Sequence, residues 1–189
     1  MPNWCNNGIT LRHEDPAMID RVIKGQEGLL MEFLPTPKEL TETVAGFMGE
    51  DKRAAHEAQQ AANIEKYGYK DWYDWNVANW GTKWDFNLEN VERQDPNTVT
   101  AAFDSAWAPP IEAYRKLLAL GFEIEAMYYE PGMQFVGKFT GDEHGEDDDY
   151  YEYGGETSAT IREAIGAELD DYFGISDEMA QYEEEEENE

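Results

Sequence analysis

The sequence predicts an α+β protein with a ferredoxin-like, split βαβ antiparallel sheet, a helical aromatic-rich insertion and an acidic C-terminal extension. Three observations lead to this prediction. Short segments alternate apolar and polar residues, as half-buried strands do. Two segments that begin at a proline carry apolar residues at helical spacing. The elements follow the order β-α-(insertion)-β-β-α-β with one further strand, which is the order of the split βαβ motif.

The first two elements are a strand and a helix. Residues 3–12 (NWCNNGITLR) form the strand, in which the alternation of Ile9 and Leu11 marks one buried face. Asp15 and Pro16 then begin the helix, as its N-cap and its first helical residue. Apolar residues at helical spacing follow, and two glycines end the helix.

An insertion interrupts the domain at about residues 38–80. Before it, residues 29–34 (LLMEFL) are predicted to form a short strand that a Pro-Thr-Pro sequence ends. Within it, residues 50–66 are rich in Ala, Glu, Gln and Lys, which is typical of an exposed helix. Five aromatic residues lie between Tyr67 and Trp75. We expect the insertion to fold back onto the core through these rings.

The rest of the ferredoxin-like domain, which ends at residue 140, consists of strands and one helix. A Pro-Asn turn joins the first two strands into an antiparallel hairpin. The helix begins in the sequence Trp-Ala-Pro-Pro and ends before Gly121. The predicted strands are residues 84–91, 98–103, 122–129 and 133–139, and the predicted helix is residues 107–120.

Acidic residues dominate the remainder of the chain. Residues 141–182 are predicted to form an extension, with an acid-rich loop (GDEHGEDDDYYEYGGE) followed by one helix from about Ser158 to Tyr172. Residues 183–189 (EEEEENE) are a block of like charge and are predicted to be a disordered acidic tail. Residues 141–189 contain 20 acidic residues and one basic residue, so a quarter of the chain carries two-thirds of the net charge.

The charge also restricts the class of partner. The chain has 42 acidic and 14 basic residues, a formal net charge of −28. Binding to nucleic acid or to an anionic membrane requires Lys and Arg, so neither is an expected partner, and a protein with a basic surface is. No apolar run reaches the ~18–20 residues that span a bilayer, and the N-terminus has no pattern of a secretory signal. We therefore expect a protein of the host cell cytoplasm.

Three short blocks of sequence resemble a known family. They are MPNWC at the N-terminus, NWGTKWD in the middle and FDSAWAPP before the second helix of the domain. In this combination the chain is similar to the YubB-type ferredoxin-like domain proteins of phages and conjugative plasmids. The similarity spans residues 1–140, and the acidic region from Asp142 onward lies outside it. The resemblance implies an architecture and an origin in a mobile element, and it implies no catalytic residues.

Cys5 is the only cysteine, so the chain has no internal disulfide and no multi-cysteine zinc site. A nucleophilic cysteine needs a nearby base such as histidine. His13 lies at the far end of the same strand, about 25 Å away at ~3.3 Å per residue. His56 lies in the insertion and His144 in the acidic loop. The sequence therefore favours a structural Cys5 that begins a central strand together with Trp4, over a reactive thiol.

The block Asn-Trp-Gly-Thr-Lys-Trp has two interpretations. Trp80, Lys83 and Trp84 have the chemistry to stack on and pair with a nucleotide-like group. Alternatively, the two tryptophans attach the insertion to the sheet, while Asn79, Thr82 and Lys83 satisfy backbone groups at the junction. The structural interpretation is favoured, and the ligand site stays open.

The acidic extension supplies the predicted partner-binding residues. No register of its acids matches the EF-hand loop with its central glycine, so we expect no metal ion and no other cofactor. The predicted partner-binding residues are Asp142, Glu143, Glu146, Asp147, Asp148, Asp149, Glu152, Glu163, Glu168, Asp170 and Asp171.

No phosphate-binding loop, dinucleotide fingerprint, nucleophile elbow or zinc-protease motif is present, which predicts a protein that is not an enzyme. The leading hypothesis is a small phage- or plasmid-encoded inhibitor of a host defence or nucleic-acid-handling protein, acting by DNA mimicry as anti-restriction proteins do. One alternative is an accessory protein that binds its partner through the aromatic insertion, with the acids serving solubility. A second alternative is a nucleotide- or metal-dependent enzyme with its site around residues 79–84.

Overall fold

The computed structural model describes residues 3–187, which form one six-stranded antiparallel sheet and nine helices. The strands are β1 (Trp4–His13), β2 (Glu89–Asp95), β3 (Thr98–Ala106), β4 (Phe122–Glu130), β5 (Phe135–Asp142) and β6 (Gly145–Glu152). The helices are α1 (Pro16–Lys24), α2 (Leu29–Phe33), α3 (Lys38–Thr41), α4 (Arg53–Tyr67), α5 (Trp72–Trp80), α6 (Ile111–Ala119), α7 (Ile161–Ile165), α8 (Ala167–Phe173) and α9 (Ile175–Glu187).

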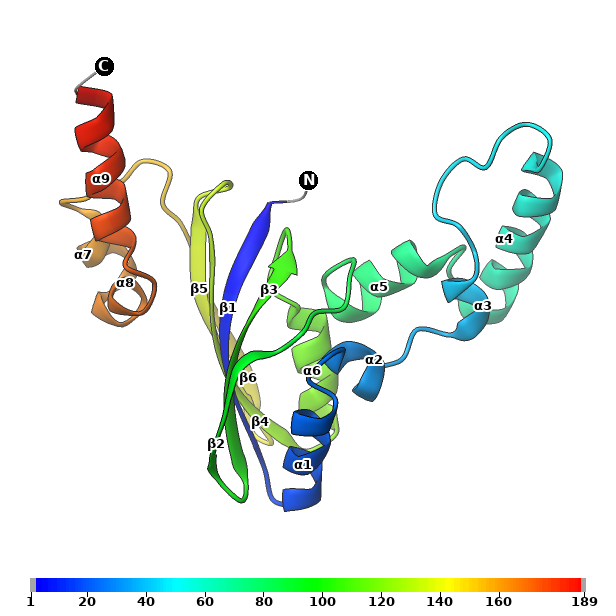
Figure 1. Ribbon diagram of the computed structural model, residues 1–189, viewed down its shortest axis with the longest axis horizontal. Coiled ribbons are helices and arrows are strands. Elements are labelled where there is room, and N and C mark those ends of the chain that lie inside the picture. The colour runs from blue at the N-terminus through cyan, green and yellow to red at the C-terminus, as the bar shows by residue number, and fades with distance from the viewer. Residues whose placement is uncertain (1–2, 188–189) are drawn as a thin grey trace.

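The sheet has the strand order β2-β3-β1-β4-β5-β6, and each neighbouring pair is antiparallel. The first four of these strands, with α1 and α6, make the split βαβ arrangement that the sequence predicts. Strands β5 and β6 extend the sheet by two hairpins. In Figure 1, α1 and α6 lie on one side of the sheet and α7–α9 on the other, while α3 and α4 reach farthest from it.

Each face of the sheet has its own apolar core. On the face covered by α1 and α6, Ile9 and Leu11 of β1 pack with buried residues of both helices. On the other face, Tyr129 of β4 and Val136 of β5 pack against Ile161 and other apolar residues of α7–α9. Because successive strand residues point to opposite faces, the same strands serve both cores.

Strand β1 lies in the interior of the sheet, between β3 and β4. Cys5, the second residue of this strand, is fully buried next to Tyr128 and Phe135. The prediction that Trp4 and Cys5 begin a central strand is therefore confirmed. The prediction of a helical insertion also holds, because α3, α4 and α5 make up most of residues 38–80 and Trp80 is part of the main core.

Residues 29–34, predicted as a strand, instead form helix α2. Its buried residues Leu29, Leu30 and Phe33 have helical spacing. The N-terminus of α2 is capped from far away in the sequence: the Asp85 carboxylate accepts hydrogen bonds from the backbone N–H groups of Leu30 (2.9 Å) and Met31 (2.8 Å). Strand β2 begins at Glu89 and not at residue 84 as predicted.

The acid-rich segment after residue 141 is a strand, not the predicted loop. Asp142 forms the turn, since its Oδ1 accepts hydrogen bonds from the N–H groups of His144 (2.7 Å) and Gly145 (3.2 Å). Strand β6 then pairs with β5 over its full length, from Asp142↔Gly145 to Phe135↔Glu152. Pairing with the inner strand β5 gives the backbone of this acidic segment hydrogen bonds that it would not have as an isolated loop.

The predicted single helix at residues 158–172 is instead two short helices, α7 and α8, and a third helix, α9, follows them at Ile175–Glu187. Gly166 and Gly174, both with positive φ, separate α7 from α8 and α8 from α9. The sequence predicts a disordered tail from residue 183, but α9 continues through Glu187. Residues 188–189 lie outside the described part of the chain. Glu183 helps to hold this helix, because its carboxylate accepts a hydrogen bond from Ser158 N–H (2.9 Å).

Candidate functional site

Strand β6 forms one edge of the sheet, and all eight of its residues are exposed. Its side chains alternate between the two faces of the sheet. Pairing of Asp148 with the buried Phe139 places Glu146, Asp148, Tyr150 and Glu152 on the α6 face. The remaining acids of the strand, Asp147 and Asp149, therefore lie on the opposite face, which α8 partly covers.

The carboxylates on the α6 face are held by neighbouring side chains. Glu146 pairs with Arg115 of α6 at 2.6 Å, and Tyr150 donates a hydrogen bond to Glu152 (3.2 Å). Tyr128 of β4 reaches across Gly137 of β5 and donates to Asp148 at 2.7 Å. A Cβ atom at Gly137 would lie 2.3 Å from this hydroxyl, so only glycine admits the contact. Burial and the bond to Asp148 raise the pKa of Tyr128, which keeps the hydroxyl a donor.

The carboxylates of Asp147 and Asp149 are free. Within residues 3–187, neither makes a side-chain hydrogen bond or an ion pair. The nearest cation by register is Lys138, opposite Asp149 on β5. Lys138 is already paired with Glu125 (3.2 Å) and with Glu168 of α8 (2.7 Å). This face of the edge strand therefore presents uncompensated negative charge to solvent.

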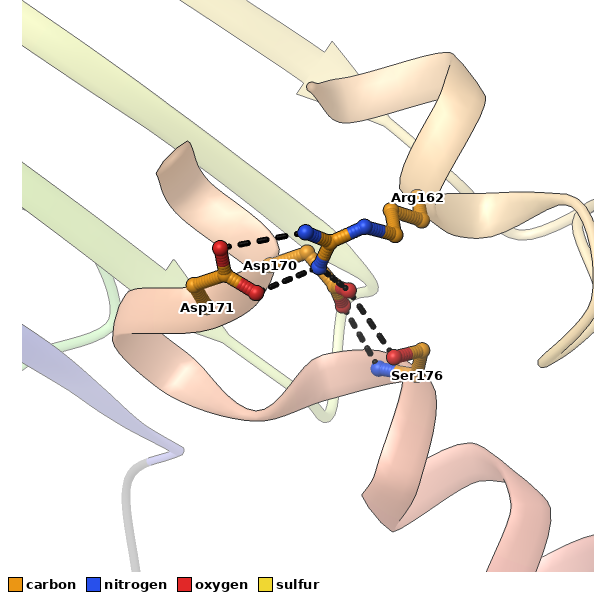
Figure 2. A network of polar contacts seen from close by, with 4 residues as sticks. All are labelled: Arg162, Asp170, Asp171 and Ser176. Atoms are coloured by element: carbon orange, nitrogen blue, oxygen red, sulfur yellow. Dashed lines mark hydrogen bonds and ion pairs between the residues drawn. The ribbon is translucent and has the colours of Figure 1, made fainter. Parts of the chain in front are cut away.

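The predicted acidic residues of the C-terminal helices have different roles. Glu163 is exposed, and Glu168 is bound to Lys138. Asp170 is only 2% exposed, so the structure places it out of reach of a partner. Figure 2 shows the reason: Asp170 accepts hydrogen bonds from Arg162 (2.9 Å) and from the N–H (2.8 Å) and hydroxyl (2.9 Å) of Ser176, while Asp171 pairs with the same arginine. This network joins α7, α8 and α9.

The structure gives different roles to the four residues that were predicted as a possible site within the six-residue Asn-Trp-Gly-Thr-Lys-Trp block. Asn79 and Trp80 are structural: the Asn79 side chain donates to Trp75 O (2.8 Å) and Lys116 donates to its Oδ1. The Trp80 indole N–H donates to Leu34 O at 2.9 Å. Lys83 and Trp84, in contrast, lie at the surface. No single role fits the whole block.

Lys83 lies at the centre of an exposed aromatic cluster. Its Nζ is 3.7 Å from the ring centre of Trp84 and 4.0 Å from that of Trp107, distances typical of cation–π contacts. The Trp4 ring lies 6.1 Å from the Trp84 ring, and Tyr73 lies 6.4 Å from Trp107. Three segments far apart in the sequence thus meet at one surface. Trp107 was not predicted to be a site residue, although Pro109 and Pro110 follow it closely in the sequence.

Cys5 has no catalytic environment. Burial raises the pKa of its thiol to about 12, so almost no thiolate exists at neutral pH. Both ring nitrogens of His13 are engaged elsewhere, with Asp15 N–H (2.9 Å) and Leu120 O (3.1 Å). These observations support the structural interpretation.

We expect Cys5 in the folded protein to resist alkylation and the change Cys5→Ser to lower the free energy of unfolding by about 1–3 kcal/mol, because it buries a hydroxyl in an apolar site. Thiol titration in native and denaturing buffer and urea denaturation measure the two effects. Rapid native alkylation, or a Cys5→Ser protein that is fully stable and has lost partner binding, would contradict the structural role.

No arrangement for a metal ion is present in the described part of the chain, where no group of three His, Cys, Asp or Glu side chains is suitably placed. None of the helices within residues 3–187 is long and apolar enough to cross a membrane.

A family model described as the ferredoxin-like domain in Api92-like protein matches residues 79–189. Among solved structures, the crystal structure of protein api92 from Yersinia pseudotuberculosis has 14% sequence identity and a TM-score of 0.48, covering 82% of this chain and 99% of that chain. Comparison with curated proteins gives no significant match. The family match confirms the predicted ferredoxin-like fold. Its range includes the acidic extension, whereas the resemblance seen in the sequence ends at residue 140.

Proposed function

The chain belongs to the family of Api92-like proteins with a ferredoxin-like domain, and from this premise we propose that it is a non-enzymatic protein that binds a basic, nucleic-acid-handling surface of a partner protein. In this proposal the partner is a host protein, the origin of the chain is a phage or plasmid, and binding inhibits the partner. The binding surface is the edge strand β6.

The uncompensated face of β6 is the observation that carries the proposal. Asp147 and Asp149 are two residues apart on one strand, so their carboxylates are repeated at roughly 6.6–6.8 Å along a straight edge. A nucleic-acid strand also presents a regular row of negative charge to Lys and Arg side chains. A rigid row on a sheet edge costs less conformational entropy on binding than the same acids in a loop.

The charge of the whole extension supports the same kind of partner. Besides the exposed acids of β6, the extension carries exposed acids at Glu143, at Glu163 and on α9. Such a one-sided field attracts basic proteins over about a Debye length, ~8–10 Å at physiological salt, and raises the association rate. The same field repels nucleic acid, so the protein competes with nucleic acid and does not bind it.

A second candidate surface is the aromatic cluster around Lys83. Trp4, Trp84 and Trp107 are each more than 40% exposed, and exposed tryptophans are enriched at protein interfaces. This surface corresponds to the alternative in which the partner docks at the aromatic side of the molecule and the acids serve solubility.

The proposal is tested with the double change Asp147→Asn and Asp149→Asn. The partner is first captured from host cells on the immobilised protein and then titrated in pure form. Each exposed charge contributes about 0.5–1 kcal/mol, so we expect roughly tenfold weaker binding at low salt and a smaller loss at high salt. Duplex DNA should compete for the partner and displace it from this protein.

The matched control is Glu89→Gln with Glu92→Gln on β2, which removes two exposed acids from the opposite edge of the same sheet. We expect this control to change affinity less than twofold. Binding that is insensitive to salt, to DNA and to the β6 change would reject the proposal and favour the aromatic cluster.

A further inference from the structure

A hollow lies at the end of the sheet between β6 and the aromatic cluster. Its volume is about 570 Å³, and it is lined by Asn3, Trp107, Met133, Phe135, Tyr150 and Glu152. The Phe135 and Tyr150 rings lie 5.3 Å apart and form one wall. Met133 is 68% exposed and Tyr150 49% exposed, so large apolar side chains face solvent here without a cover.

Two residues with unusual backbone conformations belong to the segments that line this hollow: Trp107 lines it, and Gln134 lies between the lining residues Met133 and Phe135. Trp107 has φ +73° and Gln134 has φ +57°, both in the left-handed region that bulky side chains avoid. The rest of the structure holds each of them in place. Trp107 N–H donates to Asn3 O (2.9 Å), and the loop before Gln134 is fixed by Glu130, whose buried carboxylate accepts from the N–H groups of Gly132 and Met133. Such maintained strain is concentrated at functional sites.

The lining has the chemistry that recognises a cation on an apolar stem. None of its six residues is basic, and Glu152 supplies an exposed carboxylate at the rim. Aromatic faces attract cations, and a guanidinium both stacks on rings and forms two parallel hydrogen bonds to a carboxylate.

One neighbouring charge determines how a bound cationic side chain would be oriented in the hollow. The Lys83 ammonium already lies over the Trp107 ring. A second cation is therefore favoured next to Tyr150 and Glu152 rather than over the Trp107 face that Lys83 occupies, with its aliphatic stem along Trp107 and Met133. Glu152 belongs to β6, so the hollow adjoins the acidic edge strand, on the face opposite to that of Asp147 and Asp149.

We propose that this hollow binds an arginine side chain of the protein partner that docks on β6. This rests on the proposed function for the source of the arginine, and it adds a specific anchor to an otherwise diffuse electrostatic surface. Anchoring side chains in desolvated pockets carry most of the binding energy at protein interfaces.

The first experiment uses the full chain and two synthetic pentapeptides, acetyl-Gly-Gly-Arg-Gly-Gly-amide and the same peptide with leucine in place of arginine. Nuclear magnetic resonance titration at low salt should show shifts of the Trp107 indole and Tyr150 ring signals with the arginine peptide only. Equal shifts with both peptides would identify a general apolar groove and overturn the proposal, as would the absence of shifts with either.

Two variants locate the binding. Glu152→Gln removes the carboxylate charge, and Trp107→Gly removes a wall while placing glycine where φ is positive, which favours folding. We expect each to weaken arginine-peptide binding about fivefold. The matched control is Trp84→Ala: Trp84 is as exposed as Trp107, at 41%, and touches the same Lys83, but does not line the hollow. An equal loss in Trp84→Ala would overturn the assignment.

The two proposals fail separately. Asp147 and Asp149 do not line the hollow, so their replacement should leave arginine-peptide binding unchanged. Partner binding that needs these two aspartates but not Glu152 or Trp107 would reject the arginine pocket and retain the proposed function. If the arginine peptide binds but partner binding does not depend on Asp147 and Asp149, the proposed function is rejected and the arginine pocket is retained.

Discussion

Replacing Trp80 with alanine is expected to lower the free energy of unfolding by about 3–5 kcal/mol, the range for a large aromatic residue removed from a packed core. Trp80 is 2% exposed, packs in the main core and lies 5.8 Å from the Trp75 ring. Its indole N–H also satisfies Leu34 O, which the alanine variant leaves without this donor. The cost therefore includes a cavity and a lost hydrogen bond.

The matched control is Trp84→Ala, which removes an indole four residues away that is half in solvent. It should cost about 1 kcal/mol or less, because only its contacts with Trp4 and Lys83 are lost. Urea denaturation followed by circular dichroism measures both values. Hydrogen exchange should in addition show loss of protection in α5, which ends at Trp80. Similar stability of the two variants would show that Trp80 does not attach the insertion to the core.

The pattern of the sequence was sufficient for the elements whose partners are local. Strand β1 alternates, and helix α1 carries its own cap, since the Asp15 side chain accepts from Ala17 N–H at 2.9 Å. The hairpin of β2 and β3 turns at Pro96 and Asn97, as predicted. In each case the residues that determine the structure lie within a few positions of one another.

The sequence pattern gave wrong predictions where residues far apart in the sequence determine the local structure. Helix α2 has only five residues, and the cap that begins it comes from Asp85. Strand β6 has no apolar alternation, and two of its acids, Glu146 and Asp148, are bound by Arg115 of α6 and Tyr128 of β4. A strand made of Gly-Glu-Asp-Asp-Asp-Tyr-Tyr-Glu is not recognisable without knowledge of the partner strand and of these contacts.

The candidate site was predictable in composition but not in arrangement. The acids of the extension were identified, yet burial separates Asp170 from the exposed Asp147 and Asp149. The hollow beside β6 depends on the backbone of Trp107, whose positive φ no sequence rule for tryptophan predicts. Charge on an edge strand also discourages pairing with a second sheet, so under the proposed function the same acids would both attract the basic partner and keep this edge free for it.

The change Asp170→Ala is expected to lower the free energy of unfolding by about 2–3 kcal/mol, because it leaves the Ser176 N–H and hydroxyl without their buried acceptor and removes one of the two carboxylates that hold Arg162. The matched control is Asp171→Ala, which removes the other partner of Arg162 from a site whose side chain is 65% exposed. An exposed ion pair is worth about 0.2–1 kcal/mol, so this control should cost no more than that.

The cost of Asp170→Ala should also depend on pH. Burial alone would raise the pKa of Asp170, but hydrogen bonds from Ser176 and Arg162 outweigh it and lower the pKa below its ordinary value. The folded state therefore binds the proton less readily than the unfolded state, and the stabilisation is present above the unfolded pKa of about 3.9. It is lost as the pH falls through the folded pKa. Urea denaturation from pH 7 down to pH 3 should show the gap between wild type and Asp170→Ala narrowing below about pH 4. A gap that is constant with pH, or equal costs for Asp170 and Asp171, would show that the three C-terminal helices are held by their apolar contacts alone.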